Sequence, residues 1–423
     1  MRIARPFGLW AAAAAAVLAI HTPAAAQTIA IAGGRVFPVS GPPIDNATVL
    51  LVDGKITAVG ANVSTPAGAR KIDATGKWVT PGLINAATRL GLVEIGSVST
   101  TSDGTAKGER GVAAAFRSWE GLNSNSVLWA PAAAEGVTSV VALPGGRFIS
   151  GQAAVVDTAG EPRPGRVRLG PAAMVANLGS PAASESQARG EMLMRFRELL
   201  DDARDYVSRK AEFERAATRE YAAGRLHLDA LQPVLAGKLL LVVAADRASD
   251  IENVLALARE YSLRIAILGG AEAWQVADRL AAAKVPVLTT GLDNIPTSFE
   301  TLGARQENAA LLRKAGVNVI VIADEGETFN VRNIRQHAGN TVAYGLPWDE
   351  ALRAVTLAPA EVFGVSESIG SLAPGREANI VIWDGDPFEF ATRAERVFVR
   401  GIEATTNSRQ ESLTERYKIP RPK

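Results

Sequence analysis

A regular alternation of short apolar runs with amphipathic helical patterns constrains the fold more than any other feature of this chain. The alternation extends over residues 81–358. Residues 239–245 form a continuous apolar run, as a strand buried on both faces requires. The helical pattern that follows places Ile251, Val254 and Leu255 on one face, and short connections between such runs favour parallel strands. This α/β pattern has a length near the ~250 residues typical of a (β/α)8 TIM barrel, which is the fold we predict.

One segment interrupts the alternation. Residues 184–235 carry charges of both signs at helical spacing, together with apolar positions such as Leu193, Phe196 and Leu199. This pattern predicts inserted helices that cover the barrel, rather than a disordered run. A solvated face explains the charges; a surface for a specific partner is the alternative. Farther along, the sequence Ser249-Asp250-Ile251-Glu252 has the form of a helix capping box.

Both ends of the chain have the pattern of short strands. Residues 28–77 contain several apolar runs, and Asp53-Gly54 between two of them is a hairpin signal. Residues 370–405 return to the same pattern, and neither part is long enough to bury a core alone. We therefore expect one small β-sandwich built from both ends. The expected domains are a signal peptide at 1–26, sandwich parts at 27–80 and 361–410, the barrel at 81–360 and a tail at 411–423.

The first residues resemble a targeting segment. Arg2 and Arg5 precede an apolar run over residues 7–20, and a small-residue site ends at Ala26. This three-part pattern predicts a secretory signal peptide, a mature chain that begins at Gln27, and a periplasmic or secreted location. No later run is long enough to span a membrane. The formal net charge of +1 argues against nucleic acid as a partner, and the absence of cysteine excludes thiolate chemistry.

Two motifs carry a resemblance to a known family. The sequence P-G-L-I-N-A-A-T-R that begins at Pro81 resembles the amidohydrolase superfamily signature, in which P-G-x-I-D precedes x-H-x-H. The sequence G-S-L-A-P-G-R-E-A-N-I-V-I-W-D that begins at Gly370 resembles the C-terminal motif of that superfamily. The most similar branch is that of the imidazolonepropionase-related, metal-dependent hydrolases. The resemblance implies a hydrolase that acts on non-peptide C–N bonds, with a cyclic amide or dipeptide-like substrate.

The resemblance also implies metal ligands that this chain lacks. Family members place two histidines after the first barrel strand, a carboxylated lysine or a carboxylate after the fourth, and one histidine after each of the fifth and sixth. The positions that match here hold Ala87, Arg89, Asp157, Ala244, Asp246 and Gly269. The mature chain has only two histidines, His227 and His337, so a four-histidine site is excluded by count alone.

One element of the family's machinery is retained. Asp324 follows the apolar run 319–323 and matches the aspartate that shuttles a proton in the family. A carboxylate at the carboxyl end of a barrel strand lies where catalytic residues of such barrels lie. Asp324 is therefore the candidate catalytic residue; capping of its loop, or pairing with Arg332, is the alternative.

The charged residues expected at the mouth allow two arrangements. Asp157, Asp246 and Asp324, with Glu94 and Glu272 nearby, could form an oxygen-only cage for Mg²⁺, Ca²⁺ or Mn²⁺. Alternatively, Arg89 and Arg247 could neutralise these carboxylates and give a salt-bridged mouth without a cofactor. Local charge balance favours the second arrangement. We thus expect no zinc, with a weak site for a hard cation as the alternative.

Two functions remain open at this point. One is an inactive or strongly diverged amidohydrolase with an amide-like small-molecule ligand, which in its active form still hydrolyses a C–N bond. The other is a non-catalytic periplasmic binding protein, or the partner subunit of an active amidohydrolase paralogue in a homo- or hetero-oligomer. A lone aspartate as general base supplies roughly 10²–10⁴-fold acceleration, well short of what hydrolysis of an unactivated amide requires.

Overall fold

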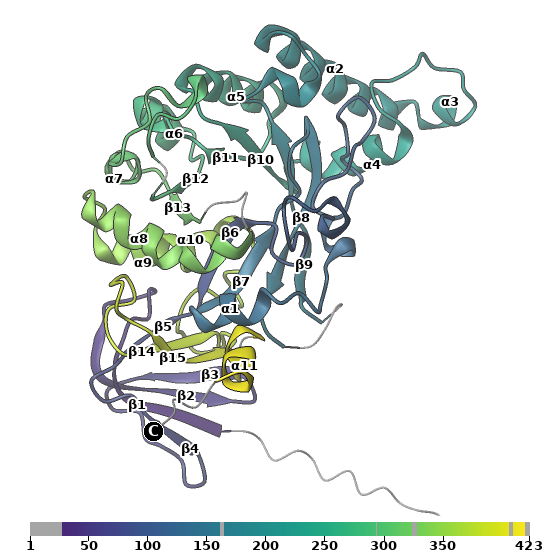
Figure 1. The fold of residues 1–423 in the computed structure, drawn as a ribbon. Helices are drawn as coiled ribbons and strands as arrows, with labels where there is room; N and C mark the ends of the chain where they lie inside the picture. The colour runs from purple at the N-terminus through teal and green to yellow at the C-terminus, as the bar shows by residue number, and fades with distance from the viewer. Residues whose placement is uncertain (1–27, 161–164, 293, 324–327, 406–408, 419–423) are drawn as a thin grey trace, which may run out of the picture.

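The computed structural model describes residues 28–160, 165–292, 294–323, 328–405 and 409–418 (Figure 1). The predicted signal peptide lies outside this part of the chain. Two sheets organise the described residues: one forms the barrel and the other forms a small β-domain below it. The predicted fold class, a TIM barrel with a small β-domain made from both chain ends, is confirmed.

The barrel sheet has eight strands in sequential order. They are β6 (Leu83–Thr88), β7 (Val137–Ala142), β8 (Ile149–Asp157), β9 (Val167–Asn177), β10 (Leu240–Ala245), β11 (Ile265–Gly269), β12 (Val287–Thr290) and β13 (Val319–Ile322). Among the described residues β13 contacts β6 without a backbone ladder, so the barrel is nearly closed. Two apolar clusters follow the period of two along each strand: Val242 and Leu268 face the interior, while Val243 and Ile267 face the helices.

One barrel strand runs against the others. β8 pairs antiparallel with both β7 and β9, whereas the remaining neighbours are parallel. The expectation of parallel strands throughout is therefore wrong at this position. The physical reason is the length of the connections. Only six residues separate β7 from β8, and parallel neighbours need a crossover of a dozen residues or more.

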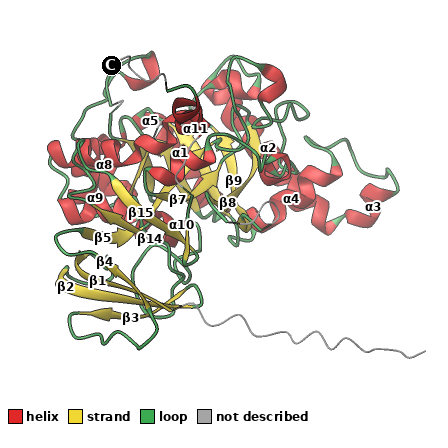
Figure 2. Ribbon diagram, turned by 60° about the horizontal axis from the view of Figure 1, so that its bottom comes forward, coloured by secondary structure: helices red, strands yellow, loops and turns green. Residues whose placement is uncertain are grey.

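Helices surround the barrel on its outer side (Figures 1 and 2). The α-helices are α1 (Trp129–Ala134), α2 (Arg189–Ser208), α3 (Lys210–Glu214), α4 (Arg225–Leu235), α5 (Ala248–Tyr261), α6 (Ala277–Ala282), α7 (Asn308–Lys314), α8 (Ile334–Ala343), α9 (Trp348–Ala354), α10 (Leu357–Val362) and α11 (Arg409–Arg416). One short 3-10 helix matters below, η5 (Phe299–Thr301). No helix in the described ranges combines the length and apolar character needed to cross a membrane.

The charged segment between β9 and β10 is helical, as predicted. It forms α2, α3 and α4, and α2 packs against α4. The apolar side of α2 buries Phe196, Leu199 and Tyr206 in the outer core of the barrel. Apart from the buried Asp202, its charged residues lie away from this core, and Arg197 pairs with Glu260 of α5. These helices are therefore the outer layer over β9 and β10.

The β-domain unites the two chain ends. Its strands are β1 (Thr28–Val36), β2 (Ile44–Val52), β3 (Lys55–Gly60), β4 (Arg70–Asp73), β5 (Trp78–Pro81), β14 (Ile380–Trp383), β15 (Ala394–Val399) and β16 (Ile402–Glu403). The join is the antiparallel pairing of β14 with β5. Because β5 leads almost directly into β6, the β-domain lies against the amino-terminal end of the barrel, as Figure 1 shows.

Candidate active site at the barrel mouth

The mouth of the barrel lies at the carboxyl ends of the parallel strands, opposite the β-domain. Ala87 is fully buried and belongs to the interior cluster. Arg89 follows two residues later, beyond the end of β6, and is half-buried. The methyl group and the guanidinium thus occupy the two positions where the family motif has histidine. Neither of these side chains is a metal ligand at neutral pH.

Arg89 is held by two glycines from neighbouring loops. A Cβ on Gly145, in the β7–β8 loop, would overlap with the guanidinium of Arg89. A Cβ on Gly104, in the long β6–α1 connection, would press on the Cδ of Arg89 at 3.1 Å. The two glycines are themselves joined, because the Gly145 N–H donates to the Gly104 carbonyl at 3.1 Å. The side chain of Arg89 therefore packs closely against these two glycines. It makes no hydrogen bond or ion pair with any residue that the structure describes.

Asp246 lies just beyond β10, on the opposite wall. Its Oδ1 accepts a hydrogen bond from the Ala271 N–H at 3.2 Å. Burial raises the pKa of Asp246, the Ala271 N–H opposes this, and the neighbouring carboxylates Glu300, Glu272 and Asp250 raise it further. The carboxyl group of Asp246 is thus costly to ionise, which is a property shared by many functional carboxylates.

Gly269 ends β11 at the position that matches the sixth-strand histidine. Its φ of +89° lies in the region that favours glycine. A Cβ at this position would also meet the Oδ1 of Asp246. Asp246 and a side chain at residue 269 therefore exclude each other, because the carboxylate fills the space that such a side chain would need.

Arg247 does not neutralise Asp246. Its guanidinium lies over the ring of Phe299 at 5.3 Å from the ring centroid, and the two charged groups form no ion pair. The expectation of a salt-bridged mouth is wrong for this pair. The reason is local: Arg247 precedes the first turn of α5, and its side chain extends toward η5 rather than toward the carboxylate.

Asp157 lies at the other end of the barrel, so its predicted place at the mouth is wrong. Since β8 is reversed, its last residue pairs with Ser139 near the start of β7. Asp157 is buried and forms ion pairs with Arg168 at 2.9 Å and with Arg400 at 2.8 Å. Arg168 also pairs with Glu377, so this network ties the base of the barrel to the β-domain.

Of the two remaining predicted residues, the structure describes Glu94 but not Asp324. Glu94 lies in the connection after β6, where its Oε1 accepts a hydrogen bond from the amide of Asn123 at 3.1 Å. Glu94 therefore lies in the loop after β6 and forms no hydrogen bond with Asp246. Asp324, the candidate catalytic residue, lies outside the described residues.

Sequence reasoning missed Arg189 and Asn177. Arg189, at the start of α2, pairs with Asp250 at 3.0 Å and with Glu300 at 3.4 Å, so it neutralises carboxylates beside Asp246. Asn177 ends β9, the fourth strand, where the family places its bridging ligand. The signal for Asn177 was present: an apolar run over residues 172–176 ends at this amide.

The residues present do not fit the zinc centre that the fold implies. Zinc sites use imidazole and thiolate as well as carboxylate ligands. His337 is buried behind the mouth, and its Nδ1 accepts a hydrogen bond from the Gly291 N–H. In the part of the chain that the structure describes, no three His, Cys, Asp or Glu residues are arranged to hold a metal ion. Arg89, a fixed positive charge, stands where one histidine would coordinate.

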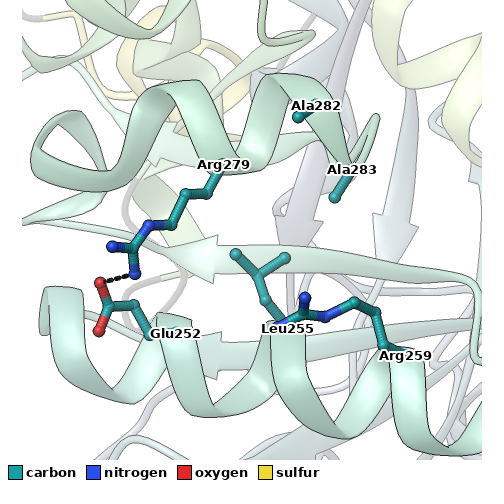
Figure 3. A pocket seen from close by; sticks show the side chains of 6 residues that line it. All are labelled: Glu252, Leu255, Arg259, Arg279, Ala282 and Ala283. Carbon is teal, nitrogen blue, oxygen red and sulfur yellow. Dashed lines mark hydrogen bonds and ion pairs between the residues drawn. The ribbon is translucent and has the colours of Figure 1, made fainter.

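A separate groove of about 330 Å³ lies on the outer surface between α5 and α6 (Figure 3). Leu255, Ala282 and Ala283 give it an apolar floor, and Arg279 forms an ion pair with Glu252 at one end. This groove is outside the barrel, so it has no part in the chemistry of the mouth.

Comparison with known proteins agrees with this architecture. A family model described as "Amidohydrolase family" matches residues 241–412. Imidazolonepropionase of Acidiphilium cryptum is 25% identical over 396 residues, covering 85% of this chain and 94% of that protein. Amidohydrolase tasK of Hapsidospora irregularis is 24% identical over 388 residues, which are 85% of this chain but only 39% of that protein.

A solved structure extends the likeness to three dimensions. An amidohydrolase from Thermotoga maritima superposes with a TM-score of 0.80 at 28% identity, covering 89% of this chain and 99% of that one. The likeness includes both the barrel and the β-domain, because nearly the whole of the other chain is matched.

Proposed function

The chain belongs to the amidohydrolase superfamily, and we propose that it is a strongly diverged member whose barrel mouth binds an amide-like small molecule without metal-activated hydrolysis. By homology it is a hydrolase of this superfamily. The observation that carries the proposal is the remodelled ligand set. Ala87 and Arg89 replace the first histidine pair, and Asp246 occupies the space in front of Gly269.

This remodelling removes the usual source of a nucleophile. A bound metal in such barrels lowers the pKa of its water, so that hydroxide forms near neutral pH. The described donors do not fit such a metal, so we derive no step through one. What the mouth retains is a set of polar groups held on rigid strand ends, and that arrangement is suited to binding.

The competing proposal is that the chain still hydrolyses an amide-like substrate. Its basis is the homology itself and the carboxylate Asp324, which follows β13 in the sequence. A carboxylate acting alone would supply roughly 10²–10⁴-fold acceleration, which favours binding over catalysis of amide hydrolysis. A partner subunit role with an active amidohydrolase is a further form of the binding proposal.

Hydrolysis by the purified chain, with and without a chelator, tests the proposal. The substrates are a cyclic amide, an imidazolone and a set of dipeptides. We expect turnover below a thousandth of that of an active amidohydrolase measured in parallel, and no effect of the chelator. The double change Ala87→His with Arg89→His should not restore activity, because Ala244 and Gly269 still provide no ligand. Chelator-sensitive hydrolysis by the unmodified chain would refute the proposal.

We also propose that the chain is exported and that Gln27 is the mature amino terminus. The support is the sequence pattern that ends at Ala26. N-terminal sequencing of the protein from a secreting host checks this; an intact Met1 on the exported protein would contradict it.

A further inference from the structure

A pocket of about 340 Å³ lies where the β-domain meets the barrel, and we call it the junction pocket. One wall is the connection between β1 and β2, residues 37–43, and the other wall is α9. α9 lies on the side of the barrel that faces the β-domain (Figures 1 and 2). The junction pocket is therefore separate from the barrel mouth and from the function proposed for it.

The walls of the junction pocket are largely apolar and partly aromatic. The β1–β2 connection contributes Phe37, Val39, Gly41, Pro42 and Pro43. The ring of Trp348 on α9 is held in place, because its centroid lies 4.8 Å from that of Phe37 and 5.2 Å from that of Phe388. Its Nε1–H also donates to Asp386 at 2.9 Å. An aromatic ring fixed in this way is a suitable platform for the apolar face of a ligand.

Val39 brings backbone strain to the same wall. Its φ of +68° lies in the region that favours glycine, where a β-branched residue is an outlier. The two residues before it are held by hydrogen bonds. The Phe37 N–H donates to the Val79 carbonyl at 2.8 Å, and the Pro38 carbonyl accepts from the Leu372 N–H at 3.0 Å. Strained residues that their surroundings hold in place are concentrated at ligand sites, so Val39 is a second indication of function.

Polar groups of both signs complete the lining. Asp349 is exposed and makes no hydrogen bond or ion pair with any residue that the structure describes. Glu350 pairs with Arg313 at 2.8 Å. Arg353 pairs with Glu361 through Nη2 at 2.6 Å, whereas its Nη1 is buried and has no hydrogen-bond partner in the described ranges. A buried N–H without an acceptor is unfavourable, so an acceptor oxygen on a ligand would stabilise this site.

These charges select among ligand classes. An anion would meet the carboxylates of Asp349 and Glu350. A cation would pair with Asp349 but would leave the Nη1 of Arg353 without an acceptor, beside a second positive charge. A neutral ligand that carries both donors and acceptors suits both residues, and a hydroxyl group is a donor and an acceptor at once.

We propose that the junction pocket binds a neutral sugar of one or two pyranose units, stacked on Trp348 and hydrogen-bonded to Asp349 and Arg353. A pyranose ring has an apolar face of C–H groups and an edge of hydroxyl groups, so it matches both the aromatic and the polar parts of the lining. A small rotation of Arg353 would bring its Nη1 to a hydroxyl oxygen while the ion pair with Glu361 is kept. The volume is near the lower end of the ~300–1,000 Å³ typical of small-molecule pockets, which suits a ligand of this size.

Calorimetric titration of the full chain with two matched sugars tests this inference. The probes are methyl glucopyranoside, which is neutral, and methyl glucuronopyranoside, which carries a carboxylate in place of one hydroxymethyl group. The neutral sugar should bind with a Kd in the millimolar range, and the acid at least about tenfold more weakly. Trp348→Leu should weaken binding of the neutral sugar by at least about tenfold, because the aromatic platform is lost.

Asp349→Asn provides a second variant, and its exposed position makes it safe for folding if Trp348→Leu does not fold. It should bind the acid more tightly than the unmodified chain does, and the neutral sugar no more tightly. Asp278→Asn is the matched control, because Asp278 is an exposed carboxylate in the first turn of another short helix, α6, and does not line the junction pocket. Its affinities should equal those of the unmodified chain.

Three results would overturn the inference. They are no binding of the neutral sugar by the folded chain, equal affinity of the unmodified chain for both sugars, and binding of a hexaproline peptide without binding of sugar. The last would assign the aromatic and proline-lined walls to a peptide instead. None of these measurements depends on hydrolysis at the mouth, so they leave the proposed function untouched.

Discussion

Side chains at the mouth occupy spaces that neighbouring glycines leave open. Gly269 adopts a φ of +89° and leaves room for the carboxylate of Asp246. Gly145 leaves room for the guanidinium of Arg89. Each new residue fits a space that its neighbours provide. Reintroducing a histidine at residue 269 would therefore meet both backbone strain and a collision with Asp246.

The raised pKa of Asp246 predicts how the free energy of unfolding depends on pH. Because burial raises its folded-state pKa, the native chain holds this proton more tightly than the unfolded chain does. The free energy of unfolding should then fall as pH rises from the unfolded pKa of about 3.9 through the raised folded value. Above that window, ionised Asp246 is a net cost to the fold.

Asp246→Asn should therefore stabilise the ligand-free chain at pH 7, because the amide keeps no charge in this buried position. The gain should shrink as the pH falls, because protonation of Asp246 in the native state removes the cost of its buried charge. Urea midpoints at pH 4, 5.5 and 7 measure this. A gain that is the same at all three values, or a loss at pH 7, would mean that the burial of Asp246 does not have this cost.

The residues of the mouth were partly predictable. The sequence predicted which residues follow the first and fifth barrel strands, because the motifs around Pro81 and Val243 are local, and the structure places Arg89 after β6 and Asp246 after β10. It did not predict that Arg247 contacts Phe299 or that Arg189 pairs with Asp250, since those partners are about 50 or more residues apart. Charge balance alone favoured an ion pair between Arg247 and Asp246. The direction of the chain at the start of α5 instead places the Arg247 guanidinium over Phe299.

At the scale of elements, the sequence predicted strands and helices well but not their directions. β8 has the apolar pattern expected of a buried strand, and nothing in that pattern distinguishes a reversed strand from a parallel one. Its reversal placed Asp157 at the wrong end of the barrel. The capping box expected at Ser249 is also wrong: α5 begins at Ala248, whose N–H donates to Glu272 of the next connection instead. Tertiary contacts override such short signals.

The contact of β14 with the barrel base gives an element-scale prediction. Trp383 is fully buried, and its Nε1–H donates to the Thr80 hydroxyl at 2.9 Å. Its ring fills the space beside Gly136, where a Cβ would overlap it. Trp383→Ala should lower the free energy of unfolding by about 3–5 kcal/mol, as expected when a large core side chain is removed.

Equilibrium denaturation of Trp383→Ala against Ile402→Ala provides the comparison. Ile402 is 63% exposed on β16 of the same domain, so its truncation should change stability by no more than about 0.5 kcal/mol. Similar small losses for both variants would mean that the contact between β14 and the barrel contributes little.

At the scale of the whole molecule, the sequence predicted the architecture because hydrophobic periodicity repeats over the full chain. Two motifs near the chain ends also indicated that one β-domain contains both, and the pairing of β14 with β5 agrees. The network of Asp157, Arg168 and Arg400 then joins this domain to the barrel base. A buried network of this kind fixes the orientation of two units, which local patterns cannot specify.

Metal content is the measurement that tests the central claim most directly. The claim is that the donors at the mouth no longer fit a catalytic metal. Elemental analysis of the full chain, purified after growth with added zinc and manganese, should find well under one metal ion per chain. A tightly held metal at one ion or more per chain would contradict the account.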